Sequence, residues 1–375
     1  MKIVIFSWRG PGHPNAGGAE QVTLEHAKGW VKKGYDVTLF TSTFPGGAEK
    51  EIIEGVKVIR KGDQIVGVRL AACFWYLMGD HQKFDIVVDE FHGLPFFTPL
   101  FVKTKKLAFI HEVAKEVWRL NPWPKPLNLI PSILGLLFEP FIFKLLYANT
   151  PFMTVSESTM HDLIDWGIDP KNITVIHNGF SAKGIRKRYK KELIKTVIFL
   201  GALSQDKGIE EAIDVFSYIY DNLDKKWQMW VVGKGGSSYL HDLILKTQSL
   251  GVKNKIKFLG YVDNNKKFEL LSRAHLLINT SVREGWGLVV IEAAAVGVPS
   301  VAFNVSGLKD SIIDKKTGLL FSYGDIKGMA EGIVQLVNDQ TKYKKLAKEA
   351  KNRTKEFNWS KSTLQSGQLI VDLVG

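Results

Sequence analysis

Short apolar runs alternate along the chain with longer segments whose apolar residues recur every three or four positions. The short runs are rich in β-branched residues, and several are apolar throughout, as in parallel strands that helices cover on both faces. Val22, His26 and Trp30 share one face of a helix predicted over Ala19–Lys33. In the first half, the pattern predicts strands at Lys2–Ser7, Asp36–Thr41, Lys57–Arg60, Asp85–Val88, Leu107–Ile110 and Met153–Ser156.

The second half of the chain repeats this plan. Each half opens with an apolar strand that runs into a turn, and no short-period repeat is visible, so two doubly wound α/β domains are predicted. In such domains ligands bind beyond the carboxyl ends of the strands, and the loops after strands are where chemistry is expected. The strands predicted here are Thr196–Leu203, Gln228–Val232, Ile256–Leu259, His275–Asn279, Ser300–Phe303 and Leu319–Phe321.

Composition places the boundary between the two domains. The segment Lys183–Lys195 contains seven basic residues and one acidic residue, Glu192. A solvated basic linker is the favoured interpretation, with a membrane-surface patch as the alternative. We therefore predict an N-terminal domain over residues 1–182 and a C-terminal domain over residues 183–358. A helical pattern over Ser360–Val374 predicts that residues 359–375 pack back on the first domain.

The composition is that of an ordinary folded protein, because 45% of its 375 residues are hydrophobic and 23% are charged. Its net charge of +12 favours an anionic partner, such as a phosphorylated molecule, an acidic membrane surface or a nucleic acid. The single cysteine, Cys73, and the short apolar run after Met1 predict a protein of the reducing cytoplasm with no signal peptide. No apolar run approaches the ~18–20 residues of a membrane-spanning helix.

The most informative segment contains Glu284 and Glu292 and leads from a strand into an Ala-rich helix expected to begin around Trp286. Gly285 and Gly287 leave N–H groups accessible at the helix start, where the helix dipole favours a phosphate. At about 1.5 Å of rise per residue, the two carboxylates lie on the order of 10 Å apart. That spacing fits a sugar at Glu284, a ribose diol at Glu292 and a diphosphate between them. A helix cap and a lysine pair are the structural alternative, but the strand–glycine–helix context favours a ligand.

This Glu284-x7-Glu292 pattern resembles the donor-site motif of the retaining glycosyltransferases of family 4. The resemblance extends over nearly the whole chain, because four further segments match that family in the same order. It implies the GT-B fold, an α/β architecture in which two Rossmann-like, doubly wound domains face each other across a cleft. The further segments are Gly17–Glu20, Thr154–Ser158, Val175–Gly179, and Phe199–Gly201 with Lys207-Gly208.

The resemblance also implies roles for individual residues. Lys207 neutralises the leaving diphosphate, His111 positions the transferred sugar and stabilises the transition state, and Glu284 completes the catalytic set. A purely structural hydrogen bond is the alternative role for His111. The donor-binding residues implied are Gly17, Gly18, Lys207, Gly233, Val262, Glu284, Gly285, Trp286, Gly287, Leu288 and Glu292.

One position departs from the family pattern. The family usually has an arginine directly after the glycine of the second domain's first strand, and this chain has Ala202 there. Arg9, Lys234 or Arg283 would then supply the missing diphosphate contact. No Asp-x-Asp pair and no His-Glu-x-x-His spacing occurs, so neither a metal nor another cofactor is predicted. In the family, a front-face reaction retains the configuration of the sugar, and the leaving phosphate takes the acceptor proton.

The segment between Leu120 and Tyr147 is rich in Pro, Trp, Leu and Phe. A buried or interdomain helix is one interpretation. The other is an interfacial segment that dips into the inner face of a membrane and receives a lipid-linked acceptor. The residues that interrupt the segment are Pro131, Glu139, Pro140 and Lys144.

The sequence therefore predicts a cytoplasmic hexosyltransferase of polysaccharide biosynthesis. Its predicted partners are a UDP- or GDP-linked sugar, a glycan or lipid-linked acceptor, and a membrane surface at residues 120–147. A nucleotide-sugar epimerase on the same fold is the alternative, which the two-glutamate motif disfavours. A nucleic-acid-binding protein is the alternative of another class, but no RNA- or DNA-binding signature is present, and no nucleic-acid partner is predicted.

Overall fold

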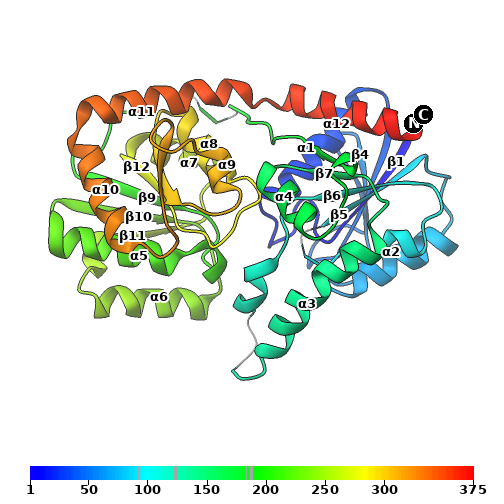
Figure 1. Ribbon diagram of the computed structural model, residues 1–375, viewed down its shortest axis with the longest axis horizontal. Helices are drawn as coiled ribbons and strands as arrows, with labels where there is room; N and C mark the ends of the chain where they lie inside the picture. Colours follow the sequence, from blue (N-terminus) through cyan, green and yellow to red (C-terminus); the bar gives the residue numbers. More distant parts are fainter. Residues whose placement is uncertain (92, 122–124, 183, 186–188) are drawn as a thin grey trace. The chain divides into compact units, whose positions relative to one another are not determined.

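The computed structural model describes residues 1–375 except 92, 122–124, 183 and 186–188 (Figure 1). The described residues form two compact units: unit 1 comprises Met1–Gly179 with Phe357–Gly375, and unit 2 comprises Phe180–Glu356. The boundaries expected from composition lie two to three residues further along the chain. Part of the basic linker and of the apolar segment lies outside the described residues, namely Lys183, Arg186, Lys187 and Arg188, and Trp123 and Pro124.

Unit 1 is built on a sheet that has eight strands, counted over the described residues, in the order β3-β4-β2-β1-β5-β6-β7-β8. All neighbours are parallel except β3 and β4. The sequence did not indicate β3, which is largely exposed, or β8, which has three residues. The strands are β1 Lys2–Ser7, β2 Asp36–Thr41, β3 Lys50–Ile53, β4 Val56–Arg60, β5 Ile86–Phe91, β6 Lys105–Ile110, β7 Phe152–Thr154 and β8 Ile173–Val175.

Two acidic residues explain why the sequence placed the end of β5 too early. Asp89 and Glu90 resemble a polar turn after Val88, but both are fully buried within the strand, which continues to Phe91. Asp89 accepts a hydrogen bond of 2.5 Å from the Tyr147 hydroxyl group. Buried charged residues of this kind are exceptions to ordinary strand composition, so the pattern alone does not reveal them.

The C-terminal helix α12 belongs to unit 1 and packs on α1. Ser366 Oγ of α12 lies 2.9 Å from His26 Nδ1 and accepts a hydrogen bond of 3.0 Å from Trp30 Nε1. The helices of unit 1 are α1 Gly18–Lys32, α2 Gly67–Met78, α3 Leu129–Leu146, α4 Glu157–Asp165 and α12 Trp359–Val374, with short 3-10 turns η1 Thr98–Leu100, η2 Lys115–Leu120 and η3 Pro170–Asn172.

Helix α3 corrects one expectation from the sequence. Its 18 residues have a mean hydropathy of 1.8, so by length and composition alone it is long and apolar enough to cross a membrane. The prolines that seemed to interrupt this segment do not end the helix. Pro131 lies in the first turn, where a missing N–H is tolerated, and Pro140 lies inside the helix.

Unit 2 contains a sheet of six parallel strands, counted over the described residues, in the order β11-β10-β9-β12-β13-β14. Apolar helix faces pack on both sides of it. The strands are β9 Lys195–Leu200, β10 Trp227–Val232, β11 Ile256–Gly260, β12 Leu276–Asn279, β13 Ser300–Phe303 and β14 Gly318–Phe321. The helices are α5 Ile209–Tyr218, α6 Ser237–Ser249, α7 Asn264–Arg273, α8 Leu288–Ala295, α9 Leu308–Ser311, α10 Ile326–Asn338 and α11 Gln340–Arg353, with short turns η4 Gln205–Lys207, η5 Ile219–Leu223, η6 Lys253–Lys255 and η7 Thr354–Glu356.

In each unit the strand order reverses beside the first strand. The chain of unit 1 builds β2 and β4 on one side of β1 and then returns to place β5 on the other side. The chain of unit 2 does the same with β10 and β11, and returns to place β12 beside β9. Doubly wound sheets bind ligands at such reversals, outside the carboxyl ends of the strands. The loops after β1 and β5, and those after β9 and β12, are therefore the places to look for a site.

Candidate active site

Three loops of unit 2 are tied together at the carboxyl ends of β9, β12 and β13. Gly208, after β9, has a φ of +68°, and a Cβ there would lie 1.9 Å from the Thr280 carbonyl oxygen, so only glycine fits. The Thr280 hydroxyl group in turn donates a hydrogen bond of 2.6 Å to the Gly208 carbonyl oxygen. The Glu284 N–H donates to the Ser306 carbonyl oxygen at 3.1 Å. These contacts fix the loop that carries the two-glutamate motif.

Lys207 and Glu284, both predicted to be catalytic, are in contact. Lys207 Nζ lies 3.1 Å from Glu284 Oε1, and the side chains are 26% and 17% exposed. The same carboxylate oxygen accepts a hydrogen bond of 2.8 Å from the Ser281 hydroxyl group. Lys207 follows β9 and Glu284 follows β12, so the pair stands at the reversal of the strand order. An ammonium group and a carboxylate placed together can separately bind a phosphate and a sugar hydroxyl group.

The helix after this loop begins two residues later than expected. Helix α8 begins at Leu288, and its N-cap residue, Gly287, has a φ of +74°. The side chain of Trp286 is buried, so any contact between Trp286 and a ligand falls to its backbone. The first N–H groups of an α-helix have no partner within the helix and lie at the positive end of its dipole, which suits the predicted diphosphate.

Glu292 lies just over one turn into α8, as the spacing predicted, but it has a partner that the sequence did not reveal. Lys267 Nζ, from α7, lies 2.5 Å from Glu292 Oε1. Burial raises the pKa of the Glu292 carboxyl group, and the Lys267 ammonium group acts in the opposite direction. A positive charge beside a buried carboxyl group favours its ionised form, which is the form that accepts hydrogen bonds from a diol.

The other predicted donor residues of unit 2, Gly233 and Val262, follow the neighbouring strands β10 and β11. Gly233 has a φ of +149°, and a Cβ there would lie 1.7 Å from a carbonyl oxygen of the loop after β9. Val262 is half-buried. Ala202, at the position of the family arginine, is exposed. Of the cations expected to replace that arginine, Arg283 has a buried side chain and Lys234 an exposed one.

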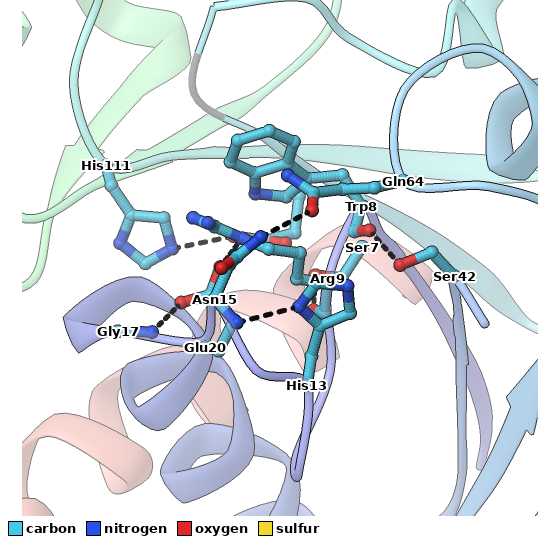
Figure 2. Close-up of polar contacts among 11 residues, drawn as sticks. Ser7, Trp8, Arg9, His13, Asn15, Gly17, Glu20, Ser42, Gln64 and His111 are labelled. Atoms are coloured by element: carbon cyan, nitrogen blue, oxygen red, sulfur yellow. Dashed lines mark hydrogen bonds and ion pairs between the residues drawn. The ribbon is translucent and has the colours of Figure 1, made fainter. Parts of the chain in front are cut away.

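In unit 1, the predicted glycine loop is closed by a glutamate of its own motif (Figure 2). Glu20 Oε2 accepts a hydrogen bond of 2.6 Å from the Gly17 N–H at the start of α1, directly before Gly18. Glu20 Oε1 accepts one of 2.7 Å from Arg9 Nε. The Arg9 guanidinium group also lies 4.0 Å from the centroid of the Trp8 ring. Arg9 is therefore already paired within unit 1 and is not a free replacement for the family arginine.

Further side chains hold the same loop in place (Figure 2). The Asn15 N–H donates a hydrogen bond of 3.1 Å to His13 Nδ1, and the Ser42 hydroxyl group donates one of 2.6 Å to the Trp8 carbonyl oxygen. Burial and the positive charge of nearby arginines lower the pKa of His13. A neutral His13 can accept the hydrogen bond from the Asn15 N–H, so the neutral form of this histidine stabilises the loop conformation.

His111 follows β6 and is paired with a buried acid of the neighbouring strand. His111 Nε2 lies 3.0 Å from Glu90 Oε1, and Glu90 is fully buried in β5. The His111 ring also packs against Phe109, with 4.4 Å between the ring centroids. Glu90 could not be recognised as a site residue from its sequence context, because the end of β5 resembles a turn there. The orientation of the predicted sugar-positioning histidine is thus set by a carboxylate at the reversal of the strand order in unit 1.

The predicted residues fall into two sets. Gly17, Gly18 and His111 belong to unit 1, and all the others belong to unit 2. In unit 2, Lys207 and Glu284 are in direct contact. Over the part of the chain that the structure describes, no three His, Cys, Asp or Glu side chains are grouped so that they could hold a metal ion.

Comparison with known proteins identifies the family. Residues 16–183 match the family described as Glycosyltransferase Family 4, and residues 182–353 match the family described as Glycosyl transferases group 1. Because the two matches together span both units, the chain belongs to this family of glycosyltransferases and is an enzyme that transfers glycosyl groups.

Proteins that are similar to this chain over its full length agree with this assignment. An uncharacterized glycosyltransferase of Methanocaldococcus jannaschii is 25% identical over 100% of this chain and 99% of that protein. Among solved structures, sucrose-phosphate synthase from Thermosynechococcus elongatus has a TM-score of 0.80 at 20% identity, over 99% of this chain and 98% of that one. HepE from Anabaena, in complex with UDP-glucose, has a TM-score of 0.74 at 18% identity over 100% of both chains. The fold is GT-B.

These findings confirm the fold class and the enzyme class that the sequence predicted. They favour neither an epimerase nor a nucleic-acid-binding protein, since both halves of the chain match glycosyltransferase models.

Proposed function

We propose that this enzyme transfers a hexosyl group from a nucleotide-diphosphate sugar to a hydroxyl group of a glycan or a lipid-linked saccharide, with retention of the anomeric configuration. The observation that carries the proposal is the Lys207–Glu284 pair at the strand-order reversal of unit 2. The family supports a sugar-nucleotide donor, and the structural neighbour HepE binds UDP-glucose. A UDP-linked sugar is therefore the first donor to test, and a GDP-linked sugar is the second.

Each predicted residue has a defined task in this proposal. On donor binding, the Lys207 ammonium group exchanges Glu284 for the diphosphate and neutralises the charge that grows as the sugar leaves. Glu284 then accepts hydrogen bonds from the sugar, and the N–H groups at the start of α8 bind the diphosphate. Glu292 accepts hydrogen bonds from the ribose hydroxyl groups. In unit 1, Gly17 and Gly18 are assigned to the diphosphate, and His111 is assigned to the transferred sugar.

The proposed reaction needs no nucleophile and no general base from the protein. The bond between the anomeric carbon and the β-phosphate oxygen breaks, and its electron pair stays on the phosphate. The acceptor oxygen attacks the same face of the sugar, forms the new carbon–oxygen bond and gives its proton to the departing phosphate oxygen. The products are a glycoside and a nucleoside diphosphate. The protein contributes by stabilising the separated charges.

The proposed acceptor follows from the surface of α3. The exposed apolar side chains of α3, such as Leu137 and Phe141, support a lipid-linked saccharide in polysaccharide biosynthesis, with residues 120–147 touching the cytoplasmic face of a membrane. The other interpretation, a buried or interdomain helix, leaves the chemistry at the donor unchanged. No metal and no further cofactor is part of the proposal.

Thermal unfolding in the presence of nucleotides tests the donor site. We expect UDP or GDP to raise the melting temperature, because a ligand at 100 times its Kd stabilises the folded state by about 2.7 kcal/mol. CMP and inorganic phosphate serve as comparison ligands. A melting temperature that responds to neither UDP nor GDP would contradict the proposed donor class.

Product analysis tests the reaction type. Incubation with the donor and a panel of glycan and lipid-linked acceptors should release nucleoside diphosphate only when an acceptor is present. Proton NMR of the first product should show the anomeric configuration of the donor, and an inverted product would refute the retaining mechanism. Conversion of the sugar nucleotide without an acceptor would instead support the epimerase.

A further inference from the structure

The loop that follows β6 contains a residue with a strained backbone. Lys115, four positions after His111, has a φ of +34°, which is unfavourable for a residue that carries a Cβ. It is the first residue of the 3-10 turn η2. A strained backbone persists only where its surroundings hold it, and such positions gather at functional sites. The contacts that hold this loop therefore bear on the position of His111.

Glu139 of α3 binds the start of the strained turn. Its side chain is buried. The carboxylate accepts hydrogen bonds from the Ala114 N–H at 2.7 Å, from the Lys115 N–H at 3.1 Å and from Trp118 Nε1 at 2.8 Å. Hydrogen bonds to an ionised acceptor are stronger than those between neutral groups. Because these bonds meet at one side chain, a shift of η2 along α3 would break them together.

Helix α3 also leaves room for the turn, which packs along it. Gly135 lies four positions before Glu139, and a Cβ at Gly135 would lie 2.1 Å from the ring of Trp118. Glycine is unfavourable inside a helix, so its position here is explained by the close approach of the tryptophan. The same face of α3 thus accommodates the turn at Gly135 and binds it at Glu139.

A second helix, α4, contacts His111 directly. The buried hydroxyl group of Thr159 donates a hydrogen bond of 3.2 Å to the His111 carbonyl oxygen. One turn later in α4, the Asp162 carboxylate is paired with the Lys115 ammonium group. The His111 ring is held by Glu90, at 3.0 Å. His111 is therefore fixed at its ring, at its carbonyl group and through the turn that follows it.

We propose that Glu139 is a positioning residue of the reaction, which holds the loop after β6 so that His111 stays at the transferred sugar. Thr159 is the second anchor of this loop. The inference rests on the role of His111 in the proposed function, and it gives a task to two residues that do not themselves bind the sugar. Misplacement of a reacting group by about 1 Å can lower a rate by about 100-fold, so the rigidity of this loop matters for catalysis.

Steady-state kinetics with the full chain test the proposal. Glu139→Gln replaces one acceptor oxygen with an NH₂ group, and it should lower kcat by roughly tenfold while the KM for the donor changes by less than about twofold. Thr159→Val removes the hydroxyl group at His111 and should lower kcat by roughly threefold.

The matched control makes the same change from carboxylate to amide elsewhere in unit 1. Asp169 accepts a hydrogen bond of 2.9 Å from the Lys171 N–H and caps η3. This turn directly precedes β8 and so lies at the amino edge of the sheet, whereas His111 follows β6 at the carboxyl edge. Asp169→Asn should leave kcat unchanged. A loss in Glu139→Gln that is confined to the KM for the donor would overturn the proposal.

A double-mutant cycle separates positioning from a purely structural role. In a His111→Ala background, Glu139→Gln should lower kcat by less than about a further twofold, because the group that it positions is gone. An equal loss in both backgrounds overturns the proposal. Urea unfolding of each variant shows whether the measured rate is that of folded protein. If Glu139→Gln does not fold, Thr159→Val carries the same cycle, and an equal loss in both backgrounds again overturns it.

Failure of this inference can be told apart from failure of the proposed function. Normal kcat in Glu139→Gln, together with a loss in His111→Ala, overturns the inference alone. An unchanged rate in His111→Ala removes the residue through which Glu139 acts, and it overturns both the inference and the role proposed for His111. Stabilisation by UDP or GDP, measured in the same samples, reports on the donor site separately.

Discussion

The two units repeat one strand-loop-helix plan but use their acidic residues differently. In unit 1, Glu20 is bound to the Gly17 N–H of its own helix and to Arg9. In unit 2, Glu284 and Glu292 are each held by a lysine from another element. A carboxylate that caps a backbone N–H is part of the fold, whereas a lysine on a long, flexible side chain can exchange its partner when a ligand arrives. We therefore expect Glu20 to act structurally in unit 1, and the binding role proposed above applies to Glu284 and Glu292 of unit 2.

The largest expected effect is the loss of catalytic rate when Lys207 of the Lys207–Glu284 pair is replaced. Lys207→Ala should lower kcat by about 10²–10³-fold, because a positioned positive charge on the leaving group is typically worth that much. Lys207→Arg should restore part of the rate, since the charge is kept. The measurement is steady-state kinetics with the donor identified by thermal shift, and the control is Lys253→Ala on the exposed surface of unit 2. Near-normal turnover of the alanine variant would remove Lys207 from the mechanism.

The histidine of unit 1 should affect the rate more than donor binding. His111→Ala is expected to lower kcat by roughly 10–100-fold and to change the Kd for the nucleoside diphosphate by less than about twofold, because His111 is assigned to the sugar. Glu90→Gln, which removes the charge beside His111 Nε2, should give a smaller loss of the same kind. An unchanged rate in His111→Ala would leave the histidine with a structural role only.

Removing the lysine of the Lys267–Glu292 pair should make nucleotide affinity depend on pH. Burial already raises the pKa of Glu292, and Lys267 opposes that shift, so Lys267→Met should raise the pKa further. The ionised fraction of Glu292 then falls at low pH and recovers as the pH rises. We expect nucleotide affinity to fall by about tenfold at low pH and to approach the parent value at high pH. Calorimetric titration across pH measures this, with Lys267→Arg as the control. A loss of affinity that does not vary with pH would contradict the link.

Each unit also contains a histidine that is expected to make its stability depend on pH. Burial lowers the pKa of His26 in unit 1 to about 3 and that of His275 in unit 2 to about 4. Between the ordinary value of about 6.5 and these values, the unfolded chain binds a proton that the folded chain does not, so stability falls as the pH falls. For the fully buried His26, the slope approaches about 1.4 kcal/mol per pH unit, because one proton is taken up on unfolding. For His275 the dependence extends over a shorter pH interval, because its pKa lies closer to the ordinary value.

Calorimetry at pH values between ~6.5 and ~5 measures this dependence, because in that interval the unfolded chain binds a proton on these histidines and the folded chain does not. His26→Gln should flatten the response of unit 1, and His275→Gln should flatten that of unit 2. An equal slope in the parent chain and both variants would assign the acid sensitivity to other groups.

The smallest expected effect is on the stability of unit 1 when Glu20 is replaced. Glu20→Ala should destabilise unit 1 by about 1–2 kcal/mol, because the Gly17 N–H loses its cap and Arg9 loses its partner. Glu25→Ala on the same helix is the matched control, since Lys28, the partner of Glu25, keeps Glu54 as a second partner. Urea unfolding measures both. A Glu20 variant with normal stability and poor nucleotide affinity would reverse the roles assigned to the two units.

Much of the fold could be predicted because it rests on local patterns. The parallel strands are apolar runs, and the strand predicted at Ser300–Phe303 matches β13. Strand β3 has only one residue that is not exposed, so it lacks an apolar signature. Likewise, α3 continues past Pro140 because its packing against the sheet compensates for the proline. In these places tertiary contacts outweigh local preference.

The candidate site also contains residues that the sequence could predict and residues that it could not. Lys207 and Glu284 could be predicted as neighbours, since both follow strands at the carboxyl edge of one sheet. Glu90 and Lys267 could not, because their importance comes from the residues that they meet. Lys267 lies 25 positions before Glu292, and only the packing of α7 beside α8 brings them together. Such pairs depend on the register between elements, which hydrophobic periodicity does not fix.

The position of α12 has a consequence for how the molecule is made. Ser366 contacts His26 and Trp30, which precede it by 340 and 336 positions in the chain. A ribosome therefore delivers the final helix of unit 1 only after all of unit 2 has been synthesised. The domain that starts first is completed last, and the ring nitrogens of His26 and Trp30 lack their native hydrogen-bond partner throughout that interval. A recombinant version of unit 1 accordingly needs residues 357–375 joined to residues 1–179.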